Sequence, residues 1–545
     1  MISSGNCPFS GTWIQHDMSS CLKLYRMKSF IVLMTACCLL MLSCSKPLVF
    51  QSYDLLITNA TIIDGTGVPA IEGSILINNG IIQQFGNIDT TRVRASQKIN
   101  AAGRVVTPGF IDTHSHGNPL ETPRFDNFLA MGSTTISLGM DGSSPGADDV
   151  ASWMNEVERA GTGPNILHFT GHNTLREIVE APRESGLDSV YIEQMKSLLT
   201  KALQTGSFGL TTGLEYDHGS FSDLTELAEL AKPVAEAGGL VMSHLRSEDD
   251  DKIVAAIREL INQARLSGAD VHISHLKIVY GNDRRRAESV RNLMQEARNE
   301  GIRITADLYP YTASYTGLSI LFPDWALPPN DYQEAAQNRR NELFSYVRNR
   351  VNARNGPEAT LFGTGLWAGF TLAEVEEYLE RPFENILIQD FGPEGTSAAY
   401  FVINEQAMRL FLTDPYVMIS SDGSPTMHHP RGYGTFAKMI RKFVIDDELL
   451  TLEDAVYKMT GLPAGTLGIS DPDIAGIPRG LIREGFAADI LIFDPENVVD
   501  LATYEDPHQY AEGFDWVFVN GTAVISDSEK NDRKPGIVIR RITHK

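Results

Sequence analysis

The stretch Pro108-Gly109-Phe110-Ile111-Asp112-Thr113-His114-Ser115-His116 carries the clearest fold signal in the chain. An apolar run that begins at Val105 ends there in polar residues, as a buried strand does where it enters a loop. His114 and His116 are two positions apart, so an extended backbone places both imidazoles on one face. The stretch therefore predicts a core strand whose end can bind a metal.

The same pattern of an apolar run with a polar end recurs along the chain. With Val105 to His114, the candidate strands are Thr134 to Met140, Asn165 to Thr170, Phe208 to Leu214, Leu240 to His244, Val271 to His275, Arg303 to Leu308 and Val417 to Ser421. Helical patterns at Leu224 to Ala237, Lys252 to Ser267 and Arg286 to Asn299 separate several of them. Eight parallel strands alternating with helices predict an α/β fold, a (β/α)8 TIM-like barrel with its functional loops at the carboxyl ends of the strands.

Both ends of the chain show strand and hairpin signals instead. Short apolar runs broken by Asn-Gly and Asp-Gly extend from Tyr53 to Gly86, within residues 53 to 104. Similar runs return at Ala488 to Phe493 and Trp516 to Ile525, within residues 485 to 545. We expect a small β-sandwich domain built from both chain ends, with the barrel at 105 to 484. Residues 326 to 400 are predicted to be an insertion before the last barrel strand, which could serve as a lid.

Composition limits the possible functions of this 545-residue chain. Its formal net charge of −23 argues against general nucleic-acid binding, because no basic stripe is available to attract phosphates. All five cysteines lie within the first 44 residues. Disulfides, zinc ribbons and a cysteine nucleophile are therefore excluded from the main body of the protein.

The first 43 residues are typical of a targeting region. Phe30 to Leu42 is apolar or small, too short for a bilayer span but suited to a signal-peptide core, although a buried N-terminal helix is the alternative. Met41-Leu42-Ser43-Cys44 resembles a bacterial lipoprotein cleavage box. We expect Cys44 to be lipidated and residues 44 to 52 to tether the protein to the bacterial cell envelope, in the periplasm or at the outer membrane. Residues 1 to 26 precede a well-formed signal start at Met27, so they are a candidate misassigned start.

Metal-binding residue types gather at the predicted strand ends. His114 and His116 follow the first strand, His244 ends the fifth, His275 ends the sixth, and Asp422 follows the eighth. In a barrel these five residues converge on one mouth. Neutral imidazole and carboxylate are ligands of zinc, and a catalytic site leaves one coordination position open for water.

The motifs resemble the amidohydrolase superfamily, specifically its D-aminoacylase (N-acyl-D-amino-acid deacylase) family, over about residues 53 to 525. Besides the first strand end, the resemblance is carried by Gly171-His172-Asn173-Thr174-Leu175-Arg176, Thr212-Gly213-Leu214-Glu215-Tyr216, Ser243-His244-Leu245-Arg246-Ser247-Glu248, Ile273-Ser274-His275-Leu276-Lys277, Asp307-Leu308-Tyr309-Pro310-Tyr311 and His429-Pro430-Arg431-Gly432-Tyr433-Gly434-Thr435-Phe436. Gly485-Phe486-Ala487-Ala488-Asp489 and Val519-Asn520-Gly521 match the family's C-terminal β segment.

The resemblance implies a role for each matching residue. His244 and His275 would hold the principal zinc, and His114 and His116 would form a neighbouring metal position. Asp422 would be a ligand or the general base. Arg431, Lys277 and Tyr309 would contact the substrate carboxylate and the developing oxyanion.

One departure from the family pattern concerns the second strand end. The family has an Asn-Cys-Gly whose thiolate binds zinc, but here the stretch is Gly139-Met140-Asp141-Gly142. Two hypotheses follow: Asp141 replaces the thiolate, or Glu215 bridges from the fourth strand. Either provides hard oxygen, which widens metal tolerance toward manganese or cobalt. The structural alternative is that Asp141 caps a following helix.

Three other polar stretches have structural and functional interpretations. His172, at the third strand end, is either a substrate or outer-shell contact or a simple turn histidine. His272 is interpreted as a packing residue, not a ligand. Glu248 to Asp251 is interpreted as the acidic first turn of a helix.

The expected activity is removal of the N-acyl group from N-acyl-D-amino acids by metal-activated water, with Asp422 as general base. The expected partners are this small-molecule substrate and the membrane reached through Cys44. Alternatives are an amidohydrolase acting on cyclic amides or on D-amino-acid-containing peptides, and an inactive metal-binding lipoprotein.

Overall fold

The computed structural model describes residues 52–280 and 284–543. The predicted signal region and the lipidation site Cys44 lie outside the described residues. Within those ranges, no helix is both long and apolar enough to cross a bilayer. A single 3-10 turn, η1 (Thr90–Arg92), lies in the short segment from residue 89 to residue 94.

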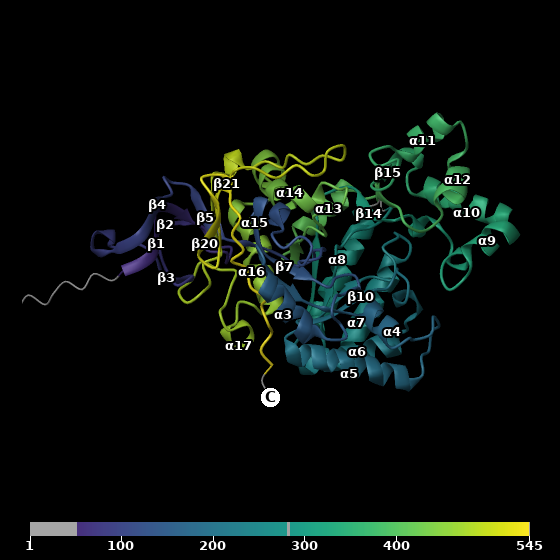
Figure 1. Ribbon diagram of the computed structural model, residues 1–545, viewed down its shortest axis with the longest axis horizontal. Coiled ribbons are helices and arrows are strands. Elements are labelled where there is room, and N and C mark those ends of the chain that lie inside the picture. Colours follow the sequence, from purple (N-terminus) through teal and green to yellow (C-terminus); the bar gives the residue numbers. More distant parts are fainter. Residues whose placement is uncertain (1–51, 281–283, 544–545) are drawn as a thin grey trace, which may run out of the picture. The chain divides into compact units, whose positions relative to one another are not determined.

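The predicted core strands form two parallel sheets (Figure 1). The first has the order β6 (Phe110–Asp112), β7 (Ser133–Leu138), β8 (Asn165–His168). The second has the order β17 (Val417–Ile419), β13 (Ile304–Leu308), β12 (Asp270–Ile273), β11 (Leu240–His244), β10 (Gly209–Gly213), β9 (Thr170–Gly171). The α/β class is therefore confirmed, and all pairings in these sheets are parallel.

The two sheets approach each other at both of their edges. Phe169 alone separates β8 from β9 along the chain. At the other edge, the Asp422 amide donates to the His114 carbonyl at 2.8 Å, and the His116 amide donates to the Gly423 carbonyl at 2.7 Å. Among the described residues the strand ladders do not close into one ring.

The first predicted strand is divided at Gly109. β5 (Val105–Pro108) pairs with β1 and β18, whereas β6 pairs with β7. A Cβ at Gly109 would lie 2.1 Å from the Thr134 Oγ1, so only glycine fits where the strand changes partners. The sequence pattern of one continuous apolar run does not reveal this change, because both halves are buried.

Helices cover the parallel strands, and α5, α6 and α7 lie side by side (Figure 1). The helices outside the insertion are α2 (Asp126–Ala130), α3 (Val150–Ala160), α4 (His172–Ile178), α5 (Ser189–Thr205), α6 (Leu224–Glu236), α7 (Ile253–Ser267), α8 (Arg284–Asn299), α13 (Glu405–Leu412), α14 (Arg431–Lys438), α15 (Leu452–Met459), α16 (Gly461–Leu467) and α17 (Pro472–Ala475). The short turns η2 (Gly219–Phe221) and η8 (Pro495–Asn497) and the π-helix η7 (Met439–Asp446) also lie outside the insertion. Asp223 caps α6 by accepting from the Glu226 amide, and left-handed Gly268 ends α7.

Strands from both chain ends form one nine-stranded sheet. Its order is β21 (Glu529–Lys530), β20 (Thr522–Ser526), β19 (Phe514–Val519), β18 (Ile490–Phe493), β5, β1 (Ser52–Ile62), β2 (Ile71–Asn78), β3 (Ile81–Gly86), and β4 (Arg94–Asn100) pairs with β1. Alternate residues of β18 face two different cores: Ile490 and Ile492 pack in the small β core, and Leu491 and Phe493 pack in the main core. The pairings give one sheet, not the two separate sheets of the expected sandwich.

A segment between β13 and β17 builds a unit with its own apolar core (Figure 1). Its antiparallel sheet has the order β14 (Ser314–Gly317), β16 (Ser397–Tyr400), β15 (Thr360–Phe362). Its helices are η3 (Leu318–Leu321), η4 (Asp324–Ala326), α9 (Tyr332–Asn338), α10 (Arg340–Ala353), η5 (Pro357–Ala359), α11 (Leu372–Leu379), α12 (Phe383–Ile386) and the π-helix η6 (Leu387–Phe391). We call residues 314–400 the insertion; it starts twelve residues before the expected position 326, because β14 pairs with β16.

Candidate metal centre

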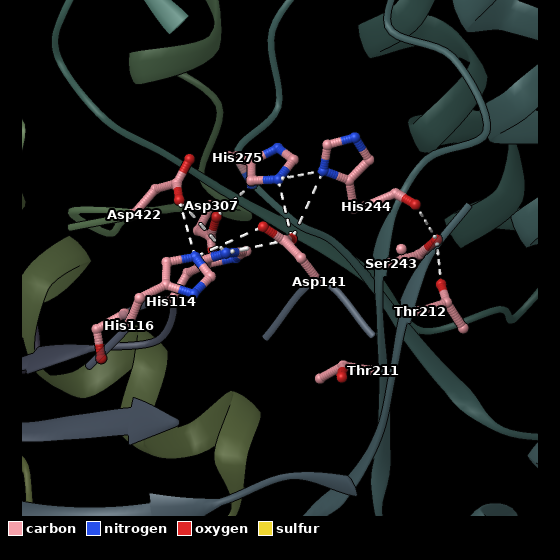
Figure 2. Close-up of polar contacts among 12 residues, drawn as sticks. His114, His116, Asp141, Thr211, Thr212, Ser243, His244, His275, Asp307 and Asp422 are labelled. Carbon is pink, nitrogen blue, oxygen red and sulfur yellow. Dashed lines mark hydrogen bonds and ion pairs between the residues drawn. The ribbon is translucent and has the colours of Figure 1, made fainter. Parts of the chain in front are cut away.

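The ends of six parallel strands bring the predicted metal ligands together. Asp141, His275 and Asp422 follow β7, β12 and β17, and each has a positive φ, at 53°, 37° and 48°. This backbone conformation is uncommon for residues other than glycine and clusters at functional sites. Here it belongs to three residues whose side chains meet the same cluster (Figure 2).

Asp141 lies at the centre of that cluster (Figure 2). Its Oδ1 is 3.3 Å from His114 Nε2, 3.2 Å from His275 Nε2 and 3.6 Å from His244 Nδ1. Its Oδ2 is 3.5 Å from His116 Nε2. One carboxylate therefore faces four imidazoles from three different strand ends.

The donor atoms form two groups that share Asp141. The first is Asp141, His244 and His275, and the second is His114, His116, Asp141 and Asp422. Ligands about 2.0 to 2.1 Å from a tetrahedral ion lie about 3.3 to 3.4 Å apart, and the contacts among these atoms run from 2.9 to 3.6 Å. Both ring nitrogens of buried His114 lack a hydrogen-bond partner. The residues present therefore fit divalent metal ions.

Glu215 lies at the edge of the cluster. Its Oε2 is 3.3 Å from His244 Nε2, the ring nitrogen on the other side from the one that faces Asp141. Glu215, His244 and Glu248 make a separate group of possible ligands. Of the two predicted oxygen ligands, Asp141 occupies the shared position.

The interpretation of Asp141 as a helix cap is wrong. The next helix, α3, begins only at Val150, and its cap is Asp149, whose carboxylate accepts from the Ser152 amide. Asp141 is instead directed into the histidine cluster. Gly142 after it approaches Asn173 so closely that a Cβ would lie 2.1 Å from the Asn173 Oδ1.

The carboxylates dominate the electrostatics of the cluster. Burial alone lowers the pKa of His116, but Asp141 and Asp422 raise it to about 10. Burial likewise opposes the charged form of His244, and Glu248, Asp141 and Glu215 raise its pKa to about 10. Burial raises the pKa of Asp141, but the surrounding imidazoles hold it well below its ordinary value. The carboxylate of Asp141 is therefore ionised.

Two buried aspartates hold the backbone of the ligand loops. Asp307 accepts from the His275 amide at 2.6 Å and contacts His272 Nε2 at 2.9 Å. Asp112 accepts from the His114 amide at 3.2 Å and from the Ser421 amide at 3.0 Å. His272 therefore supports Asp307 and does not belong to either ligand group.

Glu248 is a site residue that the sequence interpretation missed. It was interpreted as part of an acidic first helical turn, but α7 begins five residues later, at Ile253. The Glu248 Oε1 lies 2.9 Å from His275 Nδ1 and 2.5 Å from Lys277 Nζ. Glu248 thus holds both the predicted ligand His275 and the predicted substrate contact Lys277.

A cavity of about 660 Å³ opens over the cluster. Tyr309 and Arg431 line it, and the Tyr309 hydroxyl and the Arg431 Nε are buried without a hydrogen-bond partner. The guanidinium of Arg431 lies 4.6 Å from the centre of the Tyr309 ring, and its Nη1 is 3.0 Å from Asp422 Oδ2. The wall of the cavity beside Asp422 therefore contains two hydrogen-bond donors that no protein group uses.

His172 does not join these residues. It is the first residue of α4, and its Nε2 lies 2.7 Å from the buried Glu226 Oε1. Arg176 contacts the other carboxylate oxygen of Glu226 at 3.2 Å. His172 does not line the cavity. The predicted substrate contact is therefore wrong for His172, because the chain turns into α4 there and directs the ring toward α6.

Comparisons with known proteins identify the family of this chain. Residues 378–525 match the model of the amidohydrolase family. The N-acyl-D-glutamate deacylase and the N-acyl-D-aspartate deacylase of Alcaligenes xylosoxydans xylosoxydans are each 30% identical, over 90% and 89% of this chain and 97% and 95% of their own.

A solved structure shares the same architecture. The crystal structure of the N-acyl-D-glutamate deacylase from Bordetella bronchiseptica, complexed with zinc and a phosphonate inhibitor that mimics the tetrahedral intermediate, matches with a TM-score of 0.77. Its identity is 27%, over 90% of this chain and all of that one. The two deacylases that are 30% identical over 90% and 89% of this chain, together with the family model and this structure, show that the chain belongs to the D-aminoacylase family of the amidohydrolases.

Proposed function

We propose that this protein is a metal-dependent hydrolase that removes the N-acyl group from N-acyl-D-amino acids. The observation that carries the proposal is the position of Asp141 among four imidazoles, next to Asp422 and beneath the cavity that Tyr309 and Arg431 line. The cluster suits metal-assisted hydrolysis, and the donors suit a substrate carboxylate.

The proposal extends to the architecture. We propose that the two parallel sheets are the two parts of one (β/α)8 barrel, accompanied by a small β domain. The hydrogen bonds between the β6 and β17 loops and the near continuity of β8 and β9 support this arrangement. The location of the ligands at the carboxyl ends of the strands is the one that such barrels use for catalysis.

Metal ions would be held in the two donor groups. Asp141, His244 and His275 would hold one, and His114, His116, Asp141 and Asp422 would form the neighbouring position. A bound zinc, manganese or cobalt ion supplies Lewis acidity, which lowers the pKa of water and polarises an acyl carbonyl. Both groups offer only nitrogen and oxygen donors, which are compatible with all three ions.

Asp422 is the proposed general base and acid. Burial opposes its ionisation, but Arg431, His114 and His116 depress its pKa far below the ordinary range, so it is a carboxylate at neutral pH. It accepts a proton from the attacking water and passes that proton to the leaving nitrogen when the amide C–N bond breaks. The products are a carboxylic acid and a free D-amino acid.

Arg431 and Tyr309 are the proposed anchors of the α-carboxylate. The Arg431 fork can bind a carboxylate through two N–H groups, and the Tyr309 hydroxyl adds a third donor from the same wall. Lys277 lies 2.8 Å from His275 Nδ1 and is oriented by Glu248. We assign Lys277 to the developing oxyanion.

The named activities of the relatives support this substrate class, since they are deacylases of N-acyl-D-glutamate and N-acyl-D-aspartate. A ring imide without a free carboxylate would leave the Arg431 and Tyr309 donors unused. A D-amino-acid-containing peptide with a free carboxylate would fit them, and it belongs in the same assay. The intact set of His114, His116, His244, His275 and Asp422 argues against a protein that has lost its activity.

The experiment is an amine-release assay of the purified protein, freed of metal and reloaded with zinc, manganese or cobalt. The substrates are N-acetyl-D-amino acids with acidic, amide and apolar side chains, each beside its L-isomer. A cyclic imide is tested in parallel by liquid chromatography, because its ring opening releases no amine. We expect turnover of D-isomers that requires added metal. Hydrolysis of L-isomers only, or of the imide only, would refute the proposal.

We also propose that Cys44 carries a lipid that anchors the protein in the bacterial cell envelope. The support is the cleavage-box resemblance at Met41 to Cys44 and the apolar stretch before it. Mass spectrometry of the mature N-terminus should find a lipidated Cys44. Recovery of residues 1 to 26 in the mature protein would contradict the anchor.

A further inference from the structure

The cavity has a second wall, which the insertion provides. Seven insertion residues line it: Ser314, Tyr315, Thr316, Ile320, Arg354, Thr364 and Ser397. Among the described residues of the insertion, Arg354 is the one that brings a positive charge to the cavity lining. The mechanism proposed above makes no use of this charge.

Arg354 follows the last residue of α10 and is almost completely buried, at 2% exposure. Its guanidinium lies 4.8 Å from the Tyr400 ring centre and 5.4 Å from that of Tyr280. Its Nη1 donates to the Tyr280 hydroxyl at 3.3 Å, but its Nε has no partner. No carboxylate of the described chain forms an ion pair with Arg354 within 4.0 Å.

The arginine one turn earlier is a useful contrast. Arg350 Nη1 contacts Asp249 Oδ2 at 2.9 Å, and its Nε donates to the Ile320 carbonyl at 3.1 Å. Arg350 is thus neutralised within the protein, as a buried charge normally is. Arg354 lines the cavity and is stacked against aromatic rings, but its charge has no carboxylate partner and its buried Nε has no hydrogen-bond partner. An anion bound in the cavity would supply the missing countercharge.

The other cations of the cavity already have partners or roles. Lys277 is engaged by Glu248, and Arg431 faces Asp422 and the proposed α-carboxylate position. When Arg431 holds the α-carboxylate of a substrate, the side chain of that substrate must lie elsewhere in the cavity. The insertion wall offers a second, separate cationic position for it.

We propose that Arg354 binds the side-chain carboxylate of the substrate, so that the preferred substrates are N-acyl-D-amino acids with an acidic side chain. This inference rests on the proposed function. Arg354 contributes through charge-assisted hydrogen bonds in a buried site, where replacing the carboxylate by a neutral amide leaves the guanidinium unpaired. Arg354 is therefore a specificity-determining residue, outside the reacting atoms.

The test compares kcat/KM of the metal-loaded protein for N-acetyl-D-glutamate and N-acetyl-D-aspartate with that for the amides of the same shape, N-acetyl-D-glutamine and N-acetyl-D-asparagine. We expect the acidic member to be favoured by about 10- to 100-fold in at least one pair. In Arg354→Met the ratio should fall to near one. In the matched control Arg340→Met, which changes an exposed arginine at the start of the same helix, the ratio should stay at the wild-type value.

The outcomes separate this inference from the proposed function. Equal kcat/KM for acid and amide in the wild type would overturn the inference, and that comparison does not depend on whether a variant folds. A ratio that Arg354→Met leaves intact would overturn it as well. If no D-isomer of any kind released amine, the proposed function itself would fall, and the inference with it.

Discussion

The two walls of the cavity are built in different ways. The strand-end wall carries imidazoles and carboxylates on loops directly after buried strands, and it is braced by Asp112 and Asp307 beneath it. The insertion wall carries hydroxyls, aromatic rings and Arg354 on a unit with its own core. From this difference we infer a division of work in which the strand ends would perform the chemistry on every substrate and the insertion would select among substrates.

The largest expected effect concerns the chemistry of the strand-end wall. Asp422→Asn removes the proposed general base while keeping an oxygen next to the ligands, so turnover should fall by about 10²- to 10⁴-fold for every D-substrate. The metal held by Asp141, His244 and His275 should remain, as measured by elemental analysis, because Asp422 does not belong to that group. Asp251→Asn, at an exposed loop position, is the control. Turnover within tenfold of wild type would exclude Asp422 as the base.

The next comparison separates two carboxylates of the same wall. Asp141→Ala removes the shared ligand and should weaken metal binding by about 100-fold or more, with a parallel loss of activity. Glu215→Ala removes a carboxylate at the edge of the cluster and should leave most of the metal in place. A fluorescent chelator competition measures both affinities. Equal losses of metal affinity in the two variants would contradict the assignment of Asp141 as the shared ligand.

A substitution of Arg431 tests whether this residue serves all substrates while Arg354 serves only the acidic ones. Arg431→Met should raise KM for all N-acyl-D-amino acids, with kcat/KM reduced by about 10- to 100-fold, because a charged hydrogen bond to the α-carboxylate is lost. Arg354→Met should instead affect acidic substrates selectively. Steady-state kinetics on one acidic and one neutral substrate makes the comparison. Selective loss on acidic substrates in Arg431→Met would reverse the assignment of the two arginines.

The smallest expected effect is the pH dependence of metal binding. His116 and His244 have pKa values raised to about 10, so without metal both imidazoles are protonated at pH 7.5 and lose their protons only as the pH rises through about 10. A metal ligand must be deprotonated, so metal loading should release protons. The metal affinity should therefore fall by up to about tenfold for each unit by which the pH is lowered, for each proton released. Titration calorimetry in buffers of different ionisation enthalpy counts them. Loading without proton release would contradict these protonation states.

The strand-end wall was largely predictable from the sequence. Its residues follow local apolar runs, and the predicted strand Leu240 to His244 matches β11 at both ends. His172 shows the limit of that rule, since a helix starting directly at the strand end turned the ring away. Glu248 was missed because an acidic run before a helix has an ordinary structural explanation.

The insertion wall was not predictable in this way. β14 and β16 are about eighty residues apart in the chain, and their pairing has no local signature. Arg354 sits at the end of a polar helix among other arginines, and its sequence neighbours do not distinguish it from Arg348, which pairs with Glu384. Its exceptional feature, a buried guanidinium without a carboxylate, depends on tertiary contacts with Tyr280 and Tyr400.

Anomalous scattering at the zinc absorption edge, recorded from crystals of the zinc-loaded protein, tests the role of Asp141 most directly. We predict a peak in contact with Asp141, His244 and His275, and any second peak in contact with Asp141, His114 and His116. A zinc peak bound by Glu215 and Glu248 with Asp141 left free would contradict the assignment.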